Sequence, residues 1–111
     1  MNIQIFGKSK CFDTKKAQRY FKERGVKVQD IDLVKKGMSR GELQSVLRAV
    51  GGLSAVIDEG QEDAALLRYL AYDEDKLEKL LEHPKLLKSP IVRNGQKATV
   101  GYQPDVWKTW D

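Results

Sequence analysis

The one cysteine of this chain is the residue best suited to covalent or redox chemistry. Cys11 lies between residues 2–6, whose apolar side chains are typical of a short buried strand, and a helical pattern that begins near Asp13. At such a place the unpaired N–H groups and the positive end of the helix dipole favour a thiolate over a thiol. Lys8 and Lys10 add positive charge nearby. Because the thiolate is the nucleophilic form of cysteine, this position indicates redox or nucleophilic chemistry.

A structural role is the alternative for a single cysteine, since free cysteines are often small buried apolar side chains. The position of Cys11 in a turn between two elements, and not inside one of them, favours a functional role. The chain has no second cysteine, hence no Cys-x-x-Cys pair and no internal disulfide. Any disulfide formed by Cys11 must therefore join it to another molecule.

Length and composition indicate a single soluble domain. A chain of 111 residues with 41% hydrophobic and 32% charged residues can bury one modest core. We expect no signal peptide and no membrane span, because no apolar run approaches the roughly 20 residues that a span needs. These features and the single cysteine predict a cytoplasmic protein. The 20 basic and 16 acidic residues are interleaved, which argues against direct binding of nucleic acid.

Changes of hydrophobic period predict two groups of strands separated by helices. The first strand is followed by a helix over residues 13–24, capped by Asp13 or Thr14, and by an alternating strand over residues 26–33. A strand–helix–strand unit requires a crossover, which predicts that its two strands are parallel. Helices are then predicted over residues 39–50, 63–70 and 73–81, the first of them opened by a Ser39–Glu42 capping box.

The last part of the chain predicts a hairpin and a short helix. Asn94-Gly95 is a strong turn signal between strands at residues 90–93 and 97–101, and Pro104 begins a final helix that contains two tryptophans. The predicted order is therefore βαβ, a helical segment, and ββα. We interpret the tryptophans as packing residues.

Longer motifs resemble one protein family and come in that family's order. Residues 6–11 with residues 14–17 resemble the active-site turn and first helix of the arsenate reductase (ArsC)/Spx family, and residues 39–43 resemble the opening of its second helix. Residues 81–92 resemble its "hxEHPxLLxRPIV" segment, and residues 101–104 stand where its chain turns into the last helix.

This resemblance implies an α/β fold, thioredoxin-like, with a βαβ + ββα mixed sheet. It also implies one domain over residues 1–111. Its thioredoxin-like core would span about residues 1–36 and 88–111, and an inserted helical subdomain about residues 37–87.

The resemblance also implies two alternative functions. The family's enzymes use the cysteine at the Cys11 position as nucleophile, and its arsenate reductases employ glutathione with glutaredoxin. We therefore expect a thiol-dependent oxidoreductase with glutathione or glutaredoxin as possible partner and no bound cofactor or metal. Spx-type members instead regulate transcription by binding the RNA polymerase α subunit, which is the alternative function. The predicted substrate or anion site consists of Lys8, Lys10, Ser89, Pro90 and Arg93.

The chain departs from the arsenate reductase pattern at the arginines that hold the oxyanion. Ser89 and Gln103 stand where two of them are expected, and residues 53–58 contain no arginine for the third. Each charged hydrogen bond contributes about 1.5–3 kcal/mol, so these losses disfavour arsenate as a substrate. Lys8, Lys10, Lys88 and Arg93 are possible replacements, the alternative being that they are solvated surface residues.

Pro90 carries one further expectation from the resemblance. The proline before the third strand of thioredoxin-like folds is typically cis and faces the cysteine, so we expect a cis Ser89–Pro90 bond. It would present the backbone of Ser89 to Cys11, ready to pair with an extended thiol peptide such as glutathione.

Overall fold

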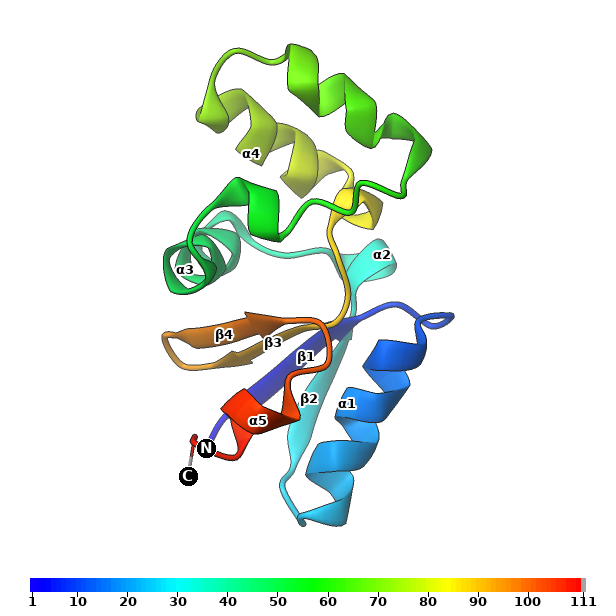
Figure 1. Cartoon of the computed structure of the whole chain (residues 1–111), viewed down its shortest axis with the longest axis vertical. Coiled ribbons are helices and arrows are strands. Elements are labelled where there is room, and N and C mark those ends of the chain that lie inside the picture. Colours follow the sequence, from blue (N-terminus) through cyan, green and yellow to red (C-terminus); the bar gives the residue numbers. More distant parts are fainter. Residues whose placement is uncertain (111) are drawn as a thin grey trace.

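Strand β1 (Ile3–Gly7) lies inside a four-stranded mixed sheet of order β2-β1-β3-β4 in the computed structural model of this chain (Figure 1). It pairs in parallel with β2 (Val28–Asp32), as predicted, and antiparallel with β3 (Ile91–Asn94). β4 (Lys97–Val100) returns antiparallel to β3 as the second strand of the predicted hairpin. The structure describes residues 1–110; Asp111, the last residue of the predicted domain, lies outside the described residues.

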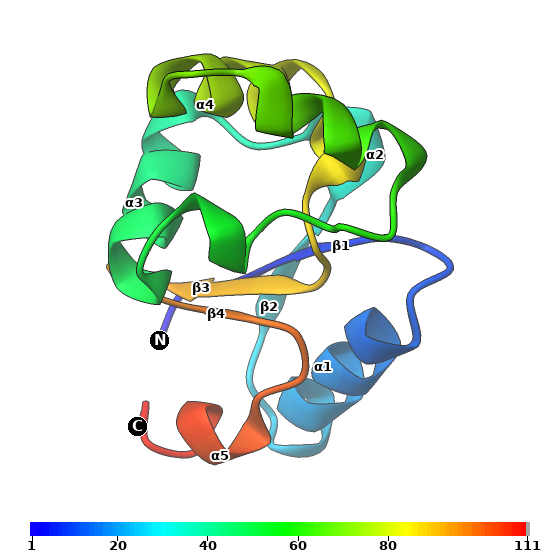
Figure 2. The ribbon, with the colours of Figure 1, turned by 45° about the horizontal axis from the view of Figure 1, so that its top comes forward.

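Helices cover both faces of this sheet (Figures 1 and 2). Helices α1 (Phe12–Glu23) and α5 (Pro104–Trp107) lie on one face, whereas α3 (Arg40–Val50) and α4 (Asp73–Glu82) lie on the other, with 3₁₀ helices between α3 and α4 in the chain. The helical elements in chain order are α1 (Phe12–Glu23), α2 (Leu33–Lys36), α3 (Arg40–Val50), η1 (Leu53–Ala55), η2 (Glu62–Tyr69), α4 (Asp73–Glu82), η3 (Pro84–Leu86) and α5 (Pro104–Trp107). The predicted boundaries of a core and an insertion near residues 37 and 87 stay a prediction.

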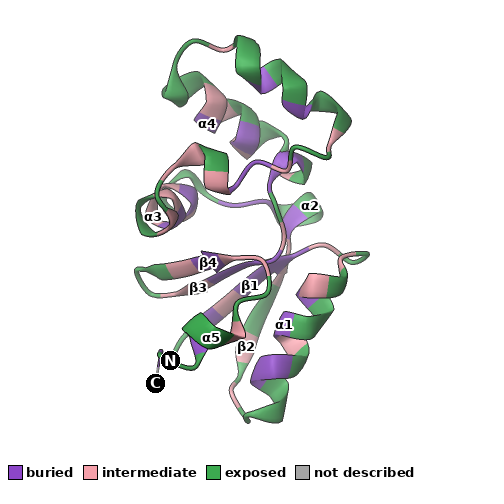
Figure 3. Cartoon of the chain, viewed as in Figure 1, coloured by how far each residue is buried: buried purple, intermediate pink, exposed green. Residues whose placement is uncertain are grey.

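The alternation of side chains along β1 creates two separate apolar clusters, one on each face. Ile3 and Ile5 point toward α1 and α5, where they pack in a cluster that contains Phe21 and Trp107. Phe6 points the other way, into a larger cluster formed with α3, α4 and the 3₁₀ turns. Successive strand residues face opposite sides of a sheet, so one strand contributes to both cores. The buried residues accordingly lie on both sides of the strands (Figure 3).

Most element ends follow the predicted local chemistry. The predicted capping box is confirmed: the Ser39 hydroxyl accepts from the Glu42 N–H, and the Glu42 carboxylate accepts from the Ser39 N–H. The predicted cap of α1 is wrong, because Cys11 occupies the N-cap position and Asp13 and Thr14 lie inside the helix. Thr14 is buried, and its hydroxyl accepts a hydrogen bond from the Lys8 N–H instead.

Three other predicted elements differ from the structure in their bounds or type. The second strand ends at Asp32, because the Asp32 carboxylate accepts hydrogen bonds from the N–H groups of Val34 and Lys35 and begins α2. The predicted helical stretch near residues 63–70 is a 3₁₀ helix, and its buried residues Ala64 and Leu67 lie three apart, as that geometry favours. The hairpin turn lies one residue later than predicted, since Asn94 still pairs with Lys97.

None of the helices within residues 1–110 combines the length and the apolar character required to cross a membrane. Over the same residues, no three histidine, cysteine or acidic side chains gather as a metal-binding group.

The hydrogen bond between Trp107 and Thr99 provides a test of how α5 is fixed to the sheet. The Trp107 indole N–H donates to the Thr99 hydroxyl at 2.7 Å, and both residues are buried. We predict that Thr99→Val lowers the free energy of unfolding by about 1–3 kcal/mol, because the indole N–H loses its partner without regaining water. Urea unfolding would measure the change. Thr109→Val, at an exposed position on the same segment, should change it by less than about 0.5 kcal/mol; equal losses in both variants would contradict the assignment.

Candidate functional site

Cys11 is held at the start of α1 by a tight loop that follows β1. The Cys11 N–H donates to the Lys8 carbonyl at 3.0 Å, and the Cys11 carbonyl accepts from the Lys15 N–H in the first helical turn. Gly7 permits this turn, because a Cβ atom at that position would collide with the Thr14 side chain. The thiol is half-buried at the N-terminus of a 12-residue helix, as predicted.

The chain before β3 brings Ser89 to the thiol from 78 residues away. The sulfur Sγ of Cys11 lies 3.5 Å from the Ser89 carbonyl oxygen. The predicted cis Ser89–Pro90 bond is confirmed. Because β1 and β3 run antiparallel with Phe6 opposite Ile91, the end of β1 and the segment before β3 lie at the same edge of the sheet.

An open cleft surrounds this pair of residues. Lys8, Lys10 and Ser89, three of the predicted site residues, line the cleft together with Cys11, and so does Lys88. The remaining residues of the lining are Asp13, Val50, Ala55, Asp58, Gln61, Val100 and Gly101. The three lysines are opposed by two aspartates, so the lining has a formal charge of +1 when Cys11 is uncharged and of zero when Cys11 is a thiolate.

Two of the predicted site residues lie elsewhere. Pro90 is buried behind Ser89 and does not line the cleft. Arg93 does not line the cleft either, and its role in an anion site stays a prediction. In the β1–β3 register Arg93 is opposite Gln4, and its guanidinium donates to the Gln4 side-chain oxygen at 2.7 Å. It also lies 3.7 Å from the Glu42 carboxylate, so it connects the sheet with α3.

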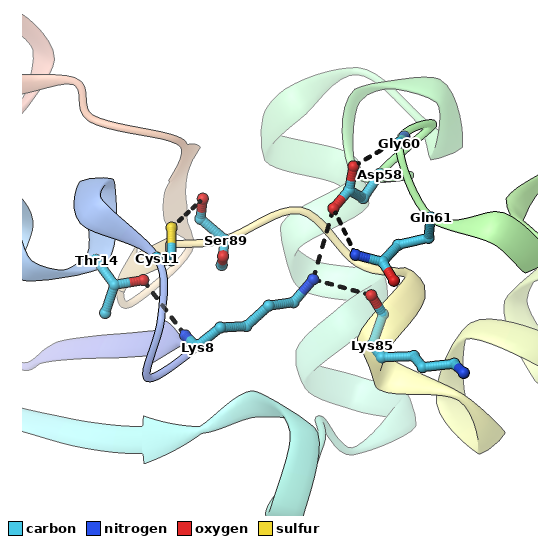
Figure 4. A network of polar contacts seen from close by, with 8 residues as sticks. All are labelled: Lys8, Cys11, Thr14, Asp58, Gly60, Gln61, Lys85 and Ser89. Carbon is cyan, nitrogen blue, oxygen red and sulfur yellow. Dashed lines mark hydrogen bonds and ion pairs between the residues drawn. The ribbon is translucent and has the colours of Figure 1, made fainter.

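Sequence reasoning did not identify Asp58, the residue that reaches the active-site loop from the helical segment. Its carboxylate lies 3.7 Å from the Lys8 ammonium, which also donates to the Lys85 carbonyl at 2.8 Å (Figure 4). The carboxylate accepts further hydrogen bonds from the Gly60 N–H and the Gln61 side chain. Burial acts to raise the pKa of Asp58, but these hydrogen bonds and Lys8 lower it overall. Asp58 is therefore held ionised next to Lys8.

The backbone near Asp58 is fixed by an isolated bridge to the segment before β3. Ile57 pairs with Leu87, and the Asp58 N–H donates to the Leu86 carbonyl at 2.8 Å. An Asp two residues before a Gly indicates a local turn, which the bond from Gly60 to Asp58 forms. That local signal carries no information about Lys8, 50 residues earlier, so only the tertiary structure identifies the pair.

The surroundings of Cys11 favour its thiolate. Burial acts to raise the pKa of Cys11, whereas hydrogen bonds from the Ser89 and Thr14 side chains and from the N–H groups of Thr14 and Asp13 lower it, and the lowering dominates. Ser89 acts in both directions. Its carbonyl accepts from the protonated thiol at 3.5 Å, while its hydroxyl donates to the thiolate. The Ser89 hydroxyl contributes most to the lowered pKa of Cys11, and the donors of the first helical turn add to it, as at other helix N-termini.

We therefore predict that alkylation of Cys11 follows a titration whose midpoint lies below about 8.5, the value of an unperturbed thiol. Because the pKa is lowered, the thiolate persists to lower pH, and the rate should level off above that midpoint. Ser89→Ala should shift the midpoint upward, since it removes a donor to the thiolate. Ser9→Ala, in the exposed part of the same loop, should leave it unchanged. A wild-type midpoint at or above that of a model thiol would show that the fold does not activate Cys11.

Comparison with known proteins places this geometry in one family. The family model described as "ArsC family" matches residues 6–110. The chain is 36% identical over 110 residues to "Global transcriptional regulator Spx 2" of Oceanobacillus iheyensis, covering 95% of this chain and 80% of that protein.

Solved structures agree in fold. An arsenate reductase from Vibrio cholerae superposes with a TM-score of 0.84 at 23% identity, over 96% of this chain and 94% of that one. SACOL0876 from Staphylococcus aureus COL superposes with a TM-score of 0.77 at 27% identity, over 96% of both chains. The predicted thioredoxin-like α/β fold is confirmed, and the chain belongs to the ArsC family.

Proposed function

We propose that this protein catalyses thiol–disulfide exchange at Cys11 in the reducing cytoplasm, with glutathione or a similar thiol peptide as co-substrate. The observation that carries the proposal is the position of Cys11: half-buried at the N-cap of α1, in an open cleft and 3.5 Å from the Ser89 carbonyl. The lowered pKa of Cys11 supports it, because the thiolate is the attacking form.

The exchange needs two steps at one cysteine. In the first, the Cys11 thiolate attacks one sulfur of a substrate disulfide. A new S–S bond to Cys11 forms, the substrate S–S bond breaks, and the other sulfur leaves as a thiolate that takes a proton from solvent. In the second, a glutathione thiolate attacks the substrate sulfur of the mixed disulfide. A substrate–glutathione disulfide forms, the S–S bond to Cys11 breaks, and Cys11 leaves as a thiolate. The N–H groups of Asp13 and Thr14 stabilise that leaving group, as they stabilise the resting thiolate.

The cleft is suited to a peptide thiol. The Ser89 carbonyl has no partner other than the Cys11 thiol among the described hydrogen bonds, so it can accept the N–H of an extended peptide next to its sulfur. Glutathione carries two carboxylates and one ammonium group, and its single net negative charge complements the +1 charge that the lining has while Cys11 is in the mixed disulfide. Gln103, at the position of an expected arginine, donates to the Val100 carbonyl, so we propose that arsenate is a poor substrate.

A second function is favoured by a separate observation. The relative at 36% identity is named a global transcriptional regulator of the Spx type, and this chain aligns with it along 95% of its own length. The alternative proposal is therefore that the protein binds the RNA polymerase α subunit through its surface. The single cysteine excludes an internal disulfide switch, so this binding would not depend on Cys11.

Glutathionylation tests the enzymatic proposal. Incubation with glutathione disulfide should produce one mixed disulfide per chain at Cys11, detected by intact mass, and added glutathione should remove it. Cys11→Ser should abolish exchange of a small disulfide substrate with glutathione and leave the unfolding midpoint nearly unchanged, because the side chain is half-buried in a turn. Undiminished exchange in Cys11→Ser would contradict the proposal.

Binding to the α subunit separates the two functions. In a pull-down with the C-terminal domain of the α subunit, the regulator proposal predicts equal retention of wild type and Cys11→Ser. The enzymatic proposal predicts that neither is retained. Retention that requires Cys11 would contradict both, since it would make the thiol part of the binding surface.

A further inference from the structure

The ion pair between Lys8 and Asp58 reduces the positive charge that the cleft can offer to an anion. Three lysines line this cleft, and a ligand with two negative charges would need them free. Lys8 is less exposed than its partner, with 16% of its side chain accessible against 34% for Asp58. Its ammonium is committed to the Asp58 carboxylate at 3.7 Å and to the Lys85 carbonyl at 2.8 Å. An incoming anion would therefore compete with a carboxylate that is already in place.

The carboxylate itself is fixed. The Gly60 N–H donates to Oδ1 at 3.0 Å and the Gln61 side chain donates to Oδ2 at 3.2 Å. The backbone of Asp58 is held by its hydrogen bond to Leu86. These contacts hold the Asp58 carboxylate beside the Lys8 ammonium (Figure 4).

We propose that Asp58 is a specificity-determining residue, which by neutralising Lys8 excludes divalent oxyanions such as sulfate, phosphate and arsenate from the Cys11 cleft and restricts it to thiol ligands of low net charge. This inference rests on the proposed thiol exchange for the identity of the preferred ligand. The exclusion of oxyanions depends only on the cleft. Lys10 and Lys88, which have no ion-pair partner among residues 1–110, supply the remaining positive charge at its rim.

Asp58→Asn tests the exclusion with nearly unchanged shape. The amide oxygen can still accept from the Gly60 N–H, while the charge next to Lys8 is removed. Sulfate binding is followed by titration of the amide signals of residues 9–12 at constant ionic strength. All variants carry Cys11→Ser, so the result does not depend on thiol chemistry. Asp58→Asn should bind sulfate about fivefold more tightly, which corresponds to the upper range of a partly exposed ion pair.

Matched controls separate this mechanism from a general change of charge. Asp63→Asn removes an exposed aspartate that pairs with Lys85 at 3.6 Å outside the cleft, and it changes the net charge by the same amount. It should alter sulfate affinity less than twofold. In a Lys8→Met background, Asp58→Asn should also lose its effect, because the lysine that it frees is absent. If Asp58→Asn does not fold, as the same spectra would show, Asp58→Ser retains an acceptor for Gly60 and replaces it.

Three results would overturn the inference: unchanged sulfate affinity in a folded Asp58 variant, an equal gain in Asp63→Asn, or a gain that persists without Lys8. Glutathione exchange by the Cys11-containing proteins is measured separately. Failure of that exchange with a gain in sulfate binding would contradict the proposed function and leave the exclusion of oxyanions supported.

Discussion

The position of β1 between β2 and β3 is the constraint on which the rest of the structure depends. Its parallel pairing with β2 requires the crossover helix α1, so the N-terminus of α1 lies beyond the end of β1. Its antiparallel pairing with β3 places the segment before Ile91 at that same end. These two pairings together bring Cys11 within 3.5 Å of Ser89 across 78 residues of chain. The site is thus a consequence of sheet topology, supported by apolar cores on both faces.

The helical segment contributes the electrostatics of the site. It packs on the face of the sheet that Phe6 faces, and the Ile57–Leu87 bridge carries Asp58 to Lys8. The loop that carries Cys11 therefore continues from β1 through the backbone and is joined to the helical segment by the Lys8–Asp58 ion pair. At the same time Arg93, a possible replacement for the missing anion-binding arginines, contacts Gln4 and Glu42 and so joins β3 to α3. Lys8 and Arg93 are thus both paired with carboxylates, and Lys10 and Lys88 are the lysines of the cleft without an ion-pair partner among residues 1–110.

Features encoded by neighbouring residues were predictable from the sequence. The Ser39 capping box, the apolar period of the helices and the strand–helix–strand order each depend on local spacing, and the structure confirms them. The alternating pattern predicts a strand that continues past Asp32 to residue 33. It does not reveal that the Asp32 carboxylate caps α2 and so ends the strand. The Asp58–Lys8 pair and the place of Arg93 depend on contacts between elements distant in sequence. Such contacts follow from register and packing, so local patterns in the sequence could place Cys11 between a strand and a helix but could not show which distant residues surround it.

We expect the fold to make Cys11 more reactive than the same thiol in an unfolded chain. The most direct measurement is the rate constant for reaction of Cys11 with glutathione disulfide in the folded protein and in the same protein unfolded in urea, at one pH near neutrality. The single cysteine makes both rates unambiguous. Our account predicts faster exchange in the folded protein, because the first turn of α1 and the Ser89 hydroxyl favour the thiolate. Equal or slower exchange in the folded protein would contradict it.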